Sequence, residues 1–391
     1  MYSTFCIVFT TLGLKNSTSM DNPFATVGYL GPETFCDREV ETKKILGNIK
    51  NGRNTCLLAP RRLGKTALIQ HVFYSLSNWT CIYIDIAGTA TVSELLKRFT
   101  SGLYNAGNKG ISVRNFLQSW KASVDFDPFT GGFSAGLSWV KPNQEKKTIE
   151  EIMRALSKTK NVVIAFDEFQ EITNYDDDSI EGWLRSIATQ FPTIRFLFCG
   201  SHQRILREMF ANQKRPFYHS ADLVQLGKID PGMYAAFIKA NLKKGKLKFQ
   251  DESQADWIYQ YCRGFTAYIQ EVCNSLFALG VSPITDEIIF KCLGDLLLKY
   301  EPYFLSYKNN LTKTQYEVLK GFATKDKIYK VNGKEFMASV GISNSSVINR
   351  TIASLLKSLF IYEDNDQQGK YYAMDNVLFQ KWIERQIRLM S

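Results

Sequence analysis

Short apolar runs alternate with helical patterns of apolar and polar residues from about residue 36 to residue 230. The runs are rich in β-branched and aromatic residues, and strands buried on both faces have this composition. Such strands, alternating with helices, form a parallel sheet with crossover helices. The sequence therefore predicts an α/β domain built on a parallel sheet. The candidate strands are 54–59, 81–87, 161–167, 194–200 and 222–226.

Residues 106–146 interrupt this alternation with glycines and prolines, including Gly110, Gly131 and Pro142, and with aromatic residues between them. Glycine and proline mark turns and loops. We interpret the stretch as an inserted hairpin or loop, and the sequence does not indicate its role.

The pattern becomes helical after residue 230 and remains so to about residue 300. Pro231 suits the first position of a helix. Two more helices are expected at 251–262 and 266–279, separated by Arg263-Gly264. We therefore place a helical domain at residues 231–300.

Residues 301–391 follow the element order of a winged helix. Two helices are followed by a third, capped by Ser345 or Ser346, and then by a hairpin with strands 358–363 and 369–374. A winged-helix domain is therefore predicted at the C-terminal end of the chain.

The chain has 391 residues, more than one ordinary hydrophobic core accommodates, so two or three domains are expected. Its 45% hydrophobic and 22% charged side chains are typical of a globular protein. Lys and Arg number 48 against 38 for Asp and Glu, a net charge of +10. This excess favours anionic partners such as nucleotides, nucleic acids or anionic lipids, without choosing among them.

The eight cysteines form no CxxC pair, and the three histidines have no ligand spacing. We interpret the cysteines as reduced residues of a cytoplasmic protein, and a histidine-based metal site is not expected. The apolar run Phe5–Phe9 is too short to span a bilayer, and no other stretch reaches that length. Residues 1–19 are interpreted as an N-terminal extension, disordered or not native, or as a misplaced start before the more ordinary beginning at Met20. Residues 20–230 are interpreted as the α/β core.

A P-loop motif follows the first candidate strand, because the run from Ala59 to Thr66 fits the pattern [AG]xxxxGK[ST] and a helical pattern comes after it. Backbone N–H groups and the helix N-terminus of such a loop converge on phosphate oxygens. Lys65 would place its charge at the β- and γ-phosphates of ATP or ADP, and the Thr66 hydroxyl would be a ligand of Mg²⁺. The candidate nucleotide-binding residues are Ala59, Pro60, Arg61, Arg62, Leu63, Gly64, Lys65, Thr66 and Ala67.

A second motif supports the first, because the apolar strand 162–166 ends in Asp167-Glu168. In P-loop proteins a carboxylate at this position holds the Mg²⁺, and an adjacent Glu accepts the proton of the attacking water. The two motifs together predict that the chain binds ATP with Mg²⁺ at Thr66 and Asp167, and that it hydrolyses ATP with Glu168 as the base.

These motifs resemble those of the prokaryotic AAA+/STAND-like P-loop ATPases, specifically the archaeal-ATPase-like group. The resemblance covers residues 20–390, and the double arginine of the P-loop is fairly specific to the group. The segments that carry the resemblance are Asn22–Phe24, Phe35–Glu39, Pro60–Thr66, Phe166–Gln170 and Cys199–Ser201.

The resemblance implies a helical lid at 231–300, an adenine site near 22–37, and two more catalytic residues. Ser201 would be a polar sensor of the γ-phosphate, although it could equally cap the helix that follows. Arg215 lies where an arginine finger could approach a γ-phosphate, although an ordinary surface arginine is the more frequent role. The lid departs from the group pattern, since Thr266 stands where the group often has a proline.

Three functions remain open at this point. The first is a nucleotide-driven molecular switch coupled to the winged helix, and the resemblance favours it. The second is a DNA-binding regulator, for which Asn344, Asn349 and Arg350 are available to a groove. The third is a scaffold without hydrolysis. The wing tip is acidic at Glu363, Asp364 and Asp366, which would repel phosphates. A winged helix used for protein contact or for docking on the ATPase core therefore stays open beside DNA binding. Oligomers are possible, and no membrane partner is expected.

Overall fold

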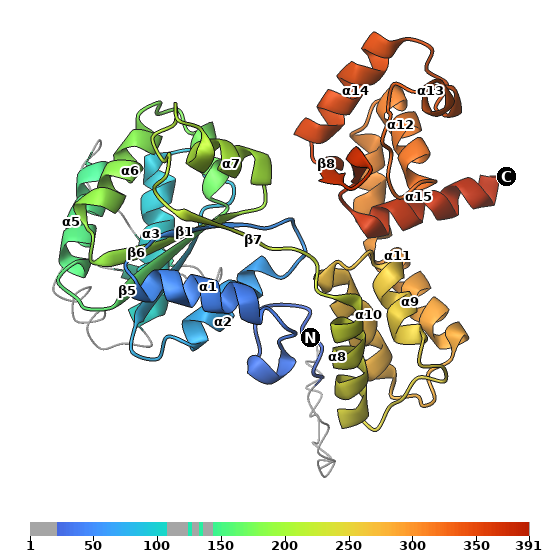
Figure 1. The fold of residues 1–391 in the computed structure, drawn as a ribbon, viewed down its shortest axis with the longest axis horizontal. Coiled ribbons are helices and arrows are strands. Elements are labelled where there is room, and N and C mark those ends of the chain that lie inside the picture. The colour runs from blue at the N-terminus through green and yellow to red at the C-terminus, as the bar shows by residue number, and fades with distance from the viewer. Residues whose placement is uncertain (1–21, 108–123, 127–132, 136–143, 391) are drawn as a thin grey trace, which may run out of the picture.

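The computed structural model describes residues 22–107, 124–126, 133–135 and 144–390. Figure 1 shows an α/β core, a helical unit beside it, and a second helical unit with a small hairpin that contains the C-terminal helix. The predicted extension 1–19 lies outside the described residues. Within 106–146, the described strands β3 (Val124–Phe126) and β4 (Phe133–Ala135) pair antiparallel.

The core contains a five-stranded sheet in the order β2-β5-β6-β1-β7, and the four pairings in it are all parallel. Each candidate strand of the sequence overlaps one strand of this sheet, so the predicted α/β architecture is confirmed. The strands are β1 (Thr55–Leu58), β2 (Thr80–Asp85), β5 (Val162–Asp167), β6 (Ile194–Gly200) and β7 (Asp222–Gln225).

Helices cover both faces of the sheet because its central strands are buried on both faces, as in β5, where all six residues are buried. Helices α1 and α2 lie on one face, and α3, α5, α6 and α7 lie on the other (Figure 1). These helices are α1 (Glu39–Lys50), α2 (Lys65–Tyr74), α3 (Val92–Gly107), α5 (Glu145–Leu156), α6 (Ile180–Gln190) and α7 (Gln203–Ala211).

A cluster of phenylalanines packs against the neighbouring strands β5 and β6 on the second face. Phe166 of β5 stacks on Phe198 of β6 with ring centroids 6.3 Å apart, and Phe169 lies 4.6 Å from Phe198. Phe169 belongs to the 3₁₀ helix η3 (Phe169–Asn174) that follows β5. The cluster therefore holds the ends of β5 and β6, where the polar residues of the P-loop site begin.

Four helices follow the core, and the first begins as predicted at Pro231, with Asp230 accepting a hydrogen bond from the Met233 N–H as its N-cap. The 24-residue helix α11 runs through the predicted domain boundary at residue 300 and connects the two helical units (Figure 1). The four are α8 (Pro231–Lys244), α9 (Gln254–Tyr261), α10 (Thr266–Leu279) and α11 (Asp286–Asn309). We refer to α8–α10 as the lid.

The C-terminal unit has the predicted winged-helix order, with two local differences. Asn344 is the N-cap of α14 instead of Ser345 or Ser346, and its side chain accepts from the Ser346 N–H. The first wing strand extends to Asp366, so a two-residue turn connects it to Gly369, whose φ of 110° suits glycine. The elements are α12 (Lys313–Ala323), α13 (Lys334–Ser339), α14 (Ser345–Lys357), β8 (Ile361–Asp366), β9 (Gly369–Met374) and α15 (Val377–Met390).

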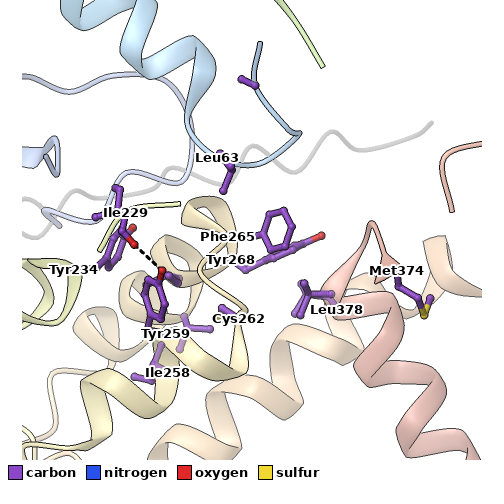
Figure 2. Packing of buried hydrophobic residues seen from close by; sticks show 14 of the residues in the cluster. Leu63, Ile229, Tyr234, Ile258, Tyr259, Cys262, Phe265, Tyr268, Met374 and Leu378 are labelled. Carbon is purple, nitrogen blue, oxygen red and sulfur yellow. Dashed lines mark hydrogen bonds between the residues drawn. The ribbon is translucent and has the colours of Figure 1, made fainter. Parts of the chain in front are cut away.

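The apolar core on the α1 and α2 face continues into the lid and the winged helix as one cluster of buried residues. Figure 2 shows its central part, where Leu63 of the P-loop, Phe265 and Tyr268 of the lid, and Leu378 of α15 gather. The three units are therefore packed together around the P-loop. None of the helices in the described part of the chain is long and apolar enough to cross a membrane.

Candidate phosphate site

The P-loop connects β1 to α2 through two left-handed residues, Arg62 with φ 66° and Gly64 with φ 87°. A Cβ at Gly64 would meet only the Thr266 methyl, at 3.8 Å, so the backbone angle and not space favours glycine here. Gly64 is the N-cap of α2, and no side chain in the described part of the protein makes a cap hydrogen bond there. The free N-terminal N–H groups of α2 are thus available to an anion.

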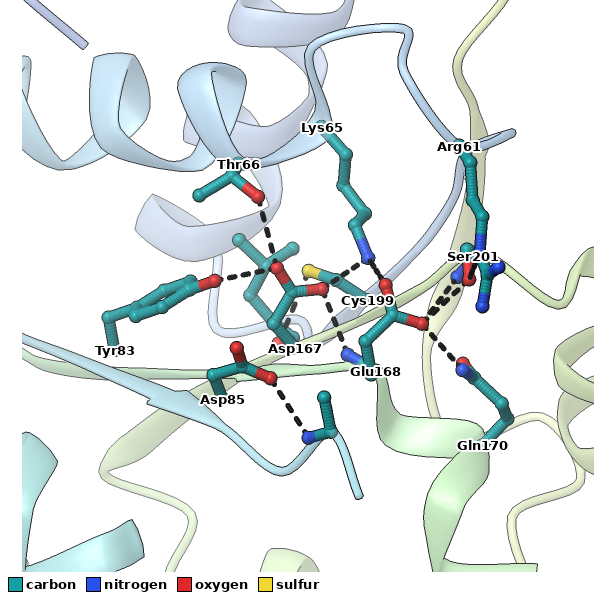
Figure 3. Close-up of polar contacts among 12 residues, drawn as sticks. Arg61, Lys65, Thr66, Tyr83, Asp85, Asp167, Glu168, Gln170, Cys199 and Ser201 are labelled. Atoms are coloured by element: carbon teal, nitrogen blue, oxygen red, sulfur yellow. Dashed lines mark hydrogen bonds and ion pairs between the residues drawn. The ribbon is translucent and has the colours of Figure 1, made fainter. Parts of the chain in front are cut away.

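The ammonium of Lys65 lies between two carboxylates, as Figure 3 shows. Its Nζ is 2.5 Å from Oε1 of Glu168 and is also paired with Oδ1 of Asp167. Burial lowers the pKa of Lys65, but the two carboxylates outweigh burial and raise it. Lys65 is therefore a buried cation whose charge is balanced by these two acids.

Asp167 is the last residue of β5 and is buried. Its Oδ2 accepts hydrogen bonds from the Thr66 hydroxyl at 3.2 Å and from the Tyr83 hydroxyl at 2.7 Å. Its Oδ1 accepts from the Glu168 N–H at 2.9 Å. Both oxygens of the carboxylate are therefore oriented by neighbours from three different elements.

Glu168 has a left-handed backbone with φ 54°, which turns its side chain toward the end of β6. Its Oε2 accepts from the Gln170 amide at 2.5 Å, from the Ser201 N–H at 3.2 Å and from the Ser201 hydroxyl at 2.7 Å. Burial raises the pKa of Glu168, but the charge of Lys65 and these hydrogen bonds lower it to about 2. In this state Glu168 is ionised and a weak proton acceptor.

Ser201 follows β6 and faces the site. The helix that follows, α7, has His202 as its N-cap and no side-chain cap hydrogen bond, so the capping role considered for Ser201 is not present. The Ser201 hydroxyl instead donates to Glu168, and it accepts from Nε of Arg61 at 3.4 Å. Arg61, one of the two arginines of the P-loop, is thereby held beside Ser201 at the candidate phosphate site.

The second P-loop arginine, Arg62, points to the C-terminal unit. Its Nη1 is 3.2 Å from Oδ2 of Asp375, and its guanidinium lies 5.2 Å from the ring centroid of Tyr268. Its carbonyl oxygen accepts from the Ala267 N–H at the start of α10, at 3.0 Å. Arg62 therefore contacts the lid and the winged helix at once.

The remaining P-loop residues have supporting positions. Ala59 and Leu63 are buried, and Pro60 and Ala67 are half-buried. The Leu63 carbonyl accepts from Nη2 of the buried Arg38 at 3.2 Å. The segment that precedes α1 is thus anchored to the P-loop.

Arg215 is placed away from these groups. Its Nη2 is 2.6 Å from Oε2 of Glu181 and its Nε is 3.2 Å from Oε1, a two-point pair between α6 and the loop after α7. Burial raises the pKa of Glu181 in spite of this arginine. Among the described residues, Arg215 makes no ion pair with Asp167 or Glu168.

Two oxygen donors fit a magnesium ion, namely the Thr66 hydroxyl and the Asp167 carboxylate, which lie 3.2 Å apart. Mg²⁺ prefers hard oxygen ligands and keeps several waters, so one or two protein oxygens beside substrate phosphates satisfy it. The described residues contain no group of three or more His, Cys, Asp or Glu side chains that could hold a metal ion alone. The donor set therefore fits a cation that is shared with a nucleotide.

Sequence reasoning missed three side chains of this site. Tyr83 and Asp375 belong to no motif. Asp375 contacts Arg62 of the P-loop, and no local pattern indicates this contact because the two residues are far apart in the sequence. Gln170 lies within the Phe166–Gln170 segment, but its spacing alone assigns it no role. All three contact residues that the motifs do identify.

The parallel sheet, the P-loop and the acidic end of β5 are those of the P-loop ATPase fold. Residues 49–210 match the family model described as "AAA domain", and residues 302–385 match the one described as "Probable winged helix domain". The chain thus contains an AAA-type P-loop ATPase domain and a C-terminal winged helix domain. No curated protein matches the sequence at a significant level.

Solved structures share this architecture over nearly the whole chain. The Walker-type ATPase of Pyrococcus abyssi is similar with a TM-score of 0.66 and 16% identity, covering 93% of this chain and 99% of that one. The ORC2 protein of Aeropyrum pernix, in ADPNP-ADP complexes, is similar with a TM-score of 0.58 and 11% identity, covering 95% and 99%. At these identities the similarity establishes the fold alone.

Proposed function

We propose that this protein is a magnesium-dependent ATP hydrolase that works as a nucleotide-driven switch coupled to its winged helix. The observation that carries the proposal is the position of the Lys65 ammonium between Asp167 and Glu168 at the N-terminus of α2. A buried cation, a helix N-terminus and two acids at one sheet edge form a site for a nucleoside triphosphate.

Lys65 would bind the β- and γ-phosphates when ATP enters. Its charge would then be shared with the phosphates, and the effect that lowers the pKa of Glu168 to about 2 would weaken. Glu168 would become a better acceptor for the proton of the attacking water. The ion pair between Lys65 and Glu168 is therefore a resting arrangement that the substrate converts into a reactive one.

Thr66 and Asp167 would hold Mg²⁺, which supplies charge stabilisation at the phosphate oxygens. Ser201 and Arg61 would face the γ-phosphate, because the Ser201 hydroxyl bonds to both Glu168 and Arg61. We leave Arg215 outside this set, since Glu181 occupies its guanidinium within the same subunit.

The coupling part of the proposal rests on three contacts between the nucleotide-binding side and the C-terminal unit. Arg62 pairs with Asp375, and the Tyr268 hydroxyl donates to Oδ1 of Asn376 at 2.8 Å. Arg263, in the turn before α10, donates from Nη1 to Gln380 Oε1 at 2.7 Å. A nucleotide that moves the P-loop or the lid would therefore change how the winged helix is held.

The test is ATP binding and turnover by the purified protein with Mg²⁺, beside Glu168→Gln and Lys65→Ala. We expect Glu168→Gln to bind ATP and to lose turnover by at least about 100-fold, the range for a general base. Lys65→Ala should lose binding, and the control Glu208→Gln, an exposed acid on α7, should behave as wild type. Binding without turnover in wild type would leave a scaffold, and absence of binding would overturn the proposal.

DNA binding through α14 is a second candidate function, since Asn349 and Arg350 are exposed on this helix. The wing hairpin gives no further support to DNA binding, because acids of the hairpin already pair with nearby lysines. Lys327 pairs with Asp366, and Lys370 pairs with Glu363. A salt-dependent affinity for duplex DNA that falls with Arg350→Ala would favour this function. Salt-independent or absent binding would leave a protein partner for the winged helix.

A further inference from the structure

The hydroxyl of Tyr83 reaches the P-loop site from the strand next to Asp167. Strands β2 and β5 pair in parallel with Tyr83 opposite Ala165 and Asp85 opposite Asp167. Tyr83 therefore lies two residues before Asp85, the residue of β2 that is opposite Asp167. Its long side chain brings its hydroxyl to 2.7 Å from Oδ2 of Asp167 (Figure 3). A shorter side chain at this position would not span that distance.

Among the described residues, the carboxylate of Asp167 has four donors, and they would not all persist when a nucleotide binds. Lys65 would transfer its contact to the phosphates, and the Thr66 oxygen would turn a lone pair to the cation. The Glu168 N–H, which bonds to Oδ1, and the Tyr83 hydroxyl, which bonds to Oδ2, would remain in place. These two donors would then fix the plane of the carboxylate. One is a backbone N–H, and the other is the side chain of Tyr83.

The Tyr83 hydroxyl is the donor of this hydrogen bond, and Oδ2 of Asp167 is its acceptor.

We infer that Tyr83 is a positioning residue for the magnesium site, one that orients the Asp167 carboxylate beside Thr66. The inference rests on the proposed function, since it needs the Thr66 and Asp167 pair to hold Mg²⁺ with a nucleotide. Side chains that orient a metal ligand in this way typically change metal affinity or activity by about 10- to 100-fold when removed.

The experiment compares Tyr83→Phe with wild type and with Tyr175→Phe. Tyr175 is a matched control, because its hydroxyl is also 2.7 Å from a buried partner, Thr89, but does not touch the site. Calorimetry measures Mg²⁺ affinity in the presence of a non-hydrolysable ATP analogue, and affinity for the analogue in EDTA. We expect Tyr83→Phe to weaken Mg²⁺ binding by about 10-fold or more and to leave affinity in EDTA unchanged.

Turnover gives a second readout, because excess Mg²⁺ should restore most of the activity of Tyr83→Phe. Unchanged Mg²⁺ affinity in Tyr83→Phe overturns the inference while the proposed function stands. A loss of analogue affinity in EDTA, or an equal effect in Tyr175→Phe, also overturns it, since the role would then be structural. If wild type shows no Mg²⁺ dependence, the proposed function fails together with the inference, and the wild-type titration alone reveals this.

Discussion

Arg62 and Asp375 form an ion pair of 3.2 Å although 313 positions of the sequence separate them. Arg62 lies in the middle of the P-loop, and Asp375 lies between the last wing strand and α15. Burial raises the pKa of Asp375, and the charges of Arg62 and Arg61 counteract this effect. The pair thus ties a carboxylate of the winged helix to the loop where a phosphate would bind.

Asp375→Asn should loosen the start of α15 in the absence of nucleotide. The change keeps the size of the side chain and removes the charge, which for a partly exposed pair is worth about 1 kcal/mol, or roughly a 5-fold change in local opening. Hydrogen exchange at residues 376–380 measures this opening. Exchange equal to wild type would show that the pair does not hold the winged helix.

Arg263→Met should weaken the docking of the winged helix on the lid more strongly. The guanidinium donates to Gln380, to the Tyr362 hydroxyl at 3.2 Å and to the Met374 carbonyl at 3.4 Å, and methionine keeps the length without the donors. We expect the free energy of unfolding to fall by about 2 kcal/mol. Urea unfolding measures it.

The control for this change is Arg263→Lys, which keeps the charge and one donor and should lose less stability than Arg263→Met. An equal loss in the two variants would mean that packing, not hydrogen bonding, carries the contact.

Gln170→Leu should reduce turnover and leave ATP affinity unchanged. The Gln170 amide is buried and donates to Oε2 of Glu168, whereas its own carbonyl oxygen has no hydrogen-bond partner among the described residues. Leucine fills similar space but cannot orient the carboxylate, so we expect kcat to fall by about 10-fold with KM within about 2-fold of wild type. A rise in KM with kcat unchanged would contradict a positioning role.

The stability of the nucleotide-free protein should depend on Glu168 at acid pH. Its pKa is lowered from 4.5 to about 2 in the folded state, so its contribution is present above pH 4.5 and is lost as the pH falls toward 2. The shift corresponds to at most about 3 kcal/mol. The free energy of unfolding of wild type minus that of Glu168→Gln should therefore shrink between pH 5 and pH 3.

Denaturant unfolding over this range tests the prediction, and the difference between the two proteins removes the contributions of other acids such as Asp177. A difference that stays constant with pH would mean that Glu168 is not held as an ion pair in solution.

Local patterns in the sequence predict the five-strand sheet and the P-loop ATPase class, because each strand and each motif is encoded within a few residues. The sequence places the cap of α14 at Ser345 or Ser346 instead of Asn344, and it ends the first wing strand at residue 363 instead of Asp366. Several neighbouring polar residues satisfy the same local rule in both places. The contacts of Tyr83 with Asp167 and of Arg62 with Asp375 could not be predicted. The first depends on the register of two strands, and the second on how a distant domain docks.

Helix α11 is long enough that a small tilt at one end would displace its other end by several ångströms. Its 24 residues span about 36 Å, so a tilt of about 10° at the lid end displaces the other end by about 6 Å. Pro302 lies inside this helix and interrupts its hydrogen bonding at the residue where the match to the winged helix domain begins. If the lid rotates over a bound nucleotide, as the proposed switch requires, α11 would convert a small rotation into a larger displacement of the winged helix, and Pro302 marks the position where this helix lacks one backbone donor.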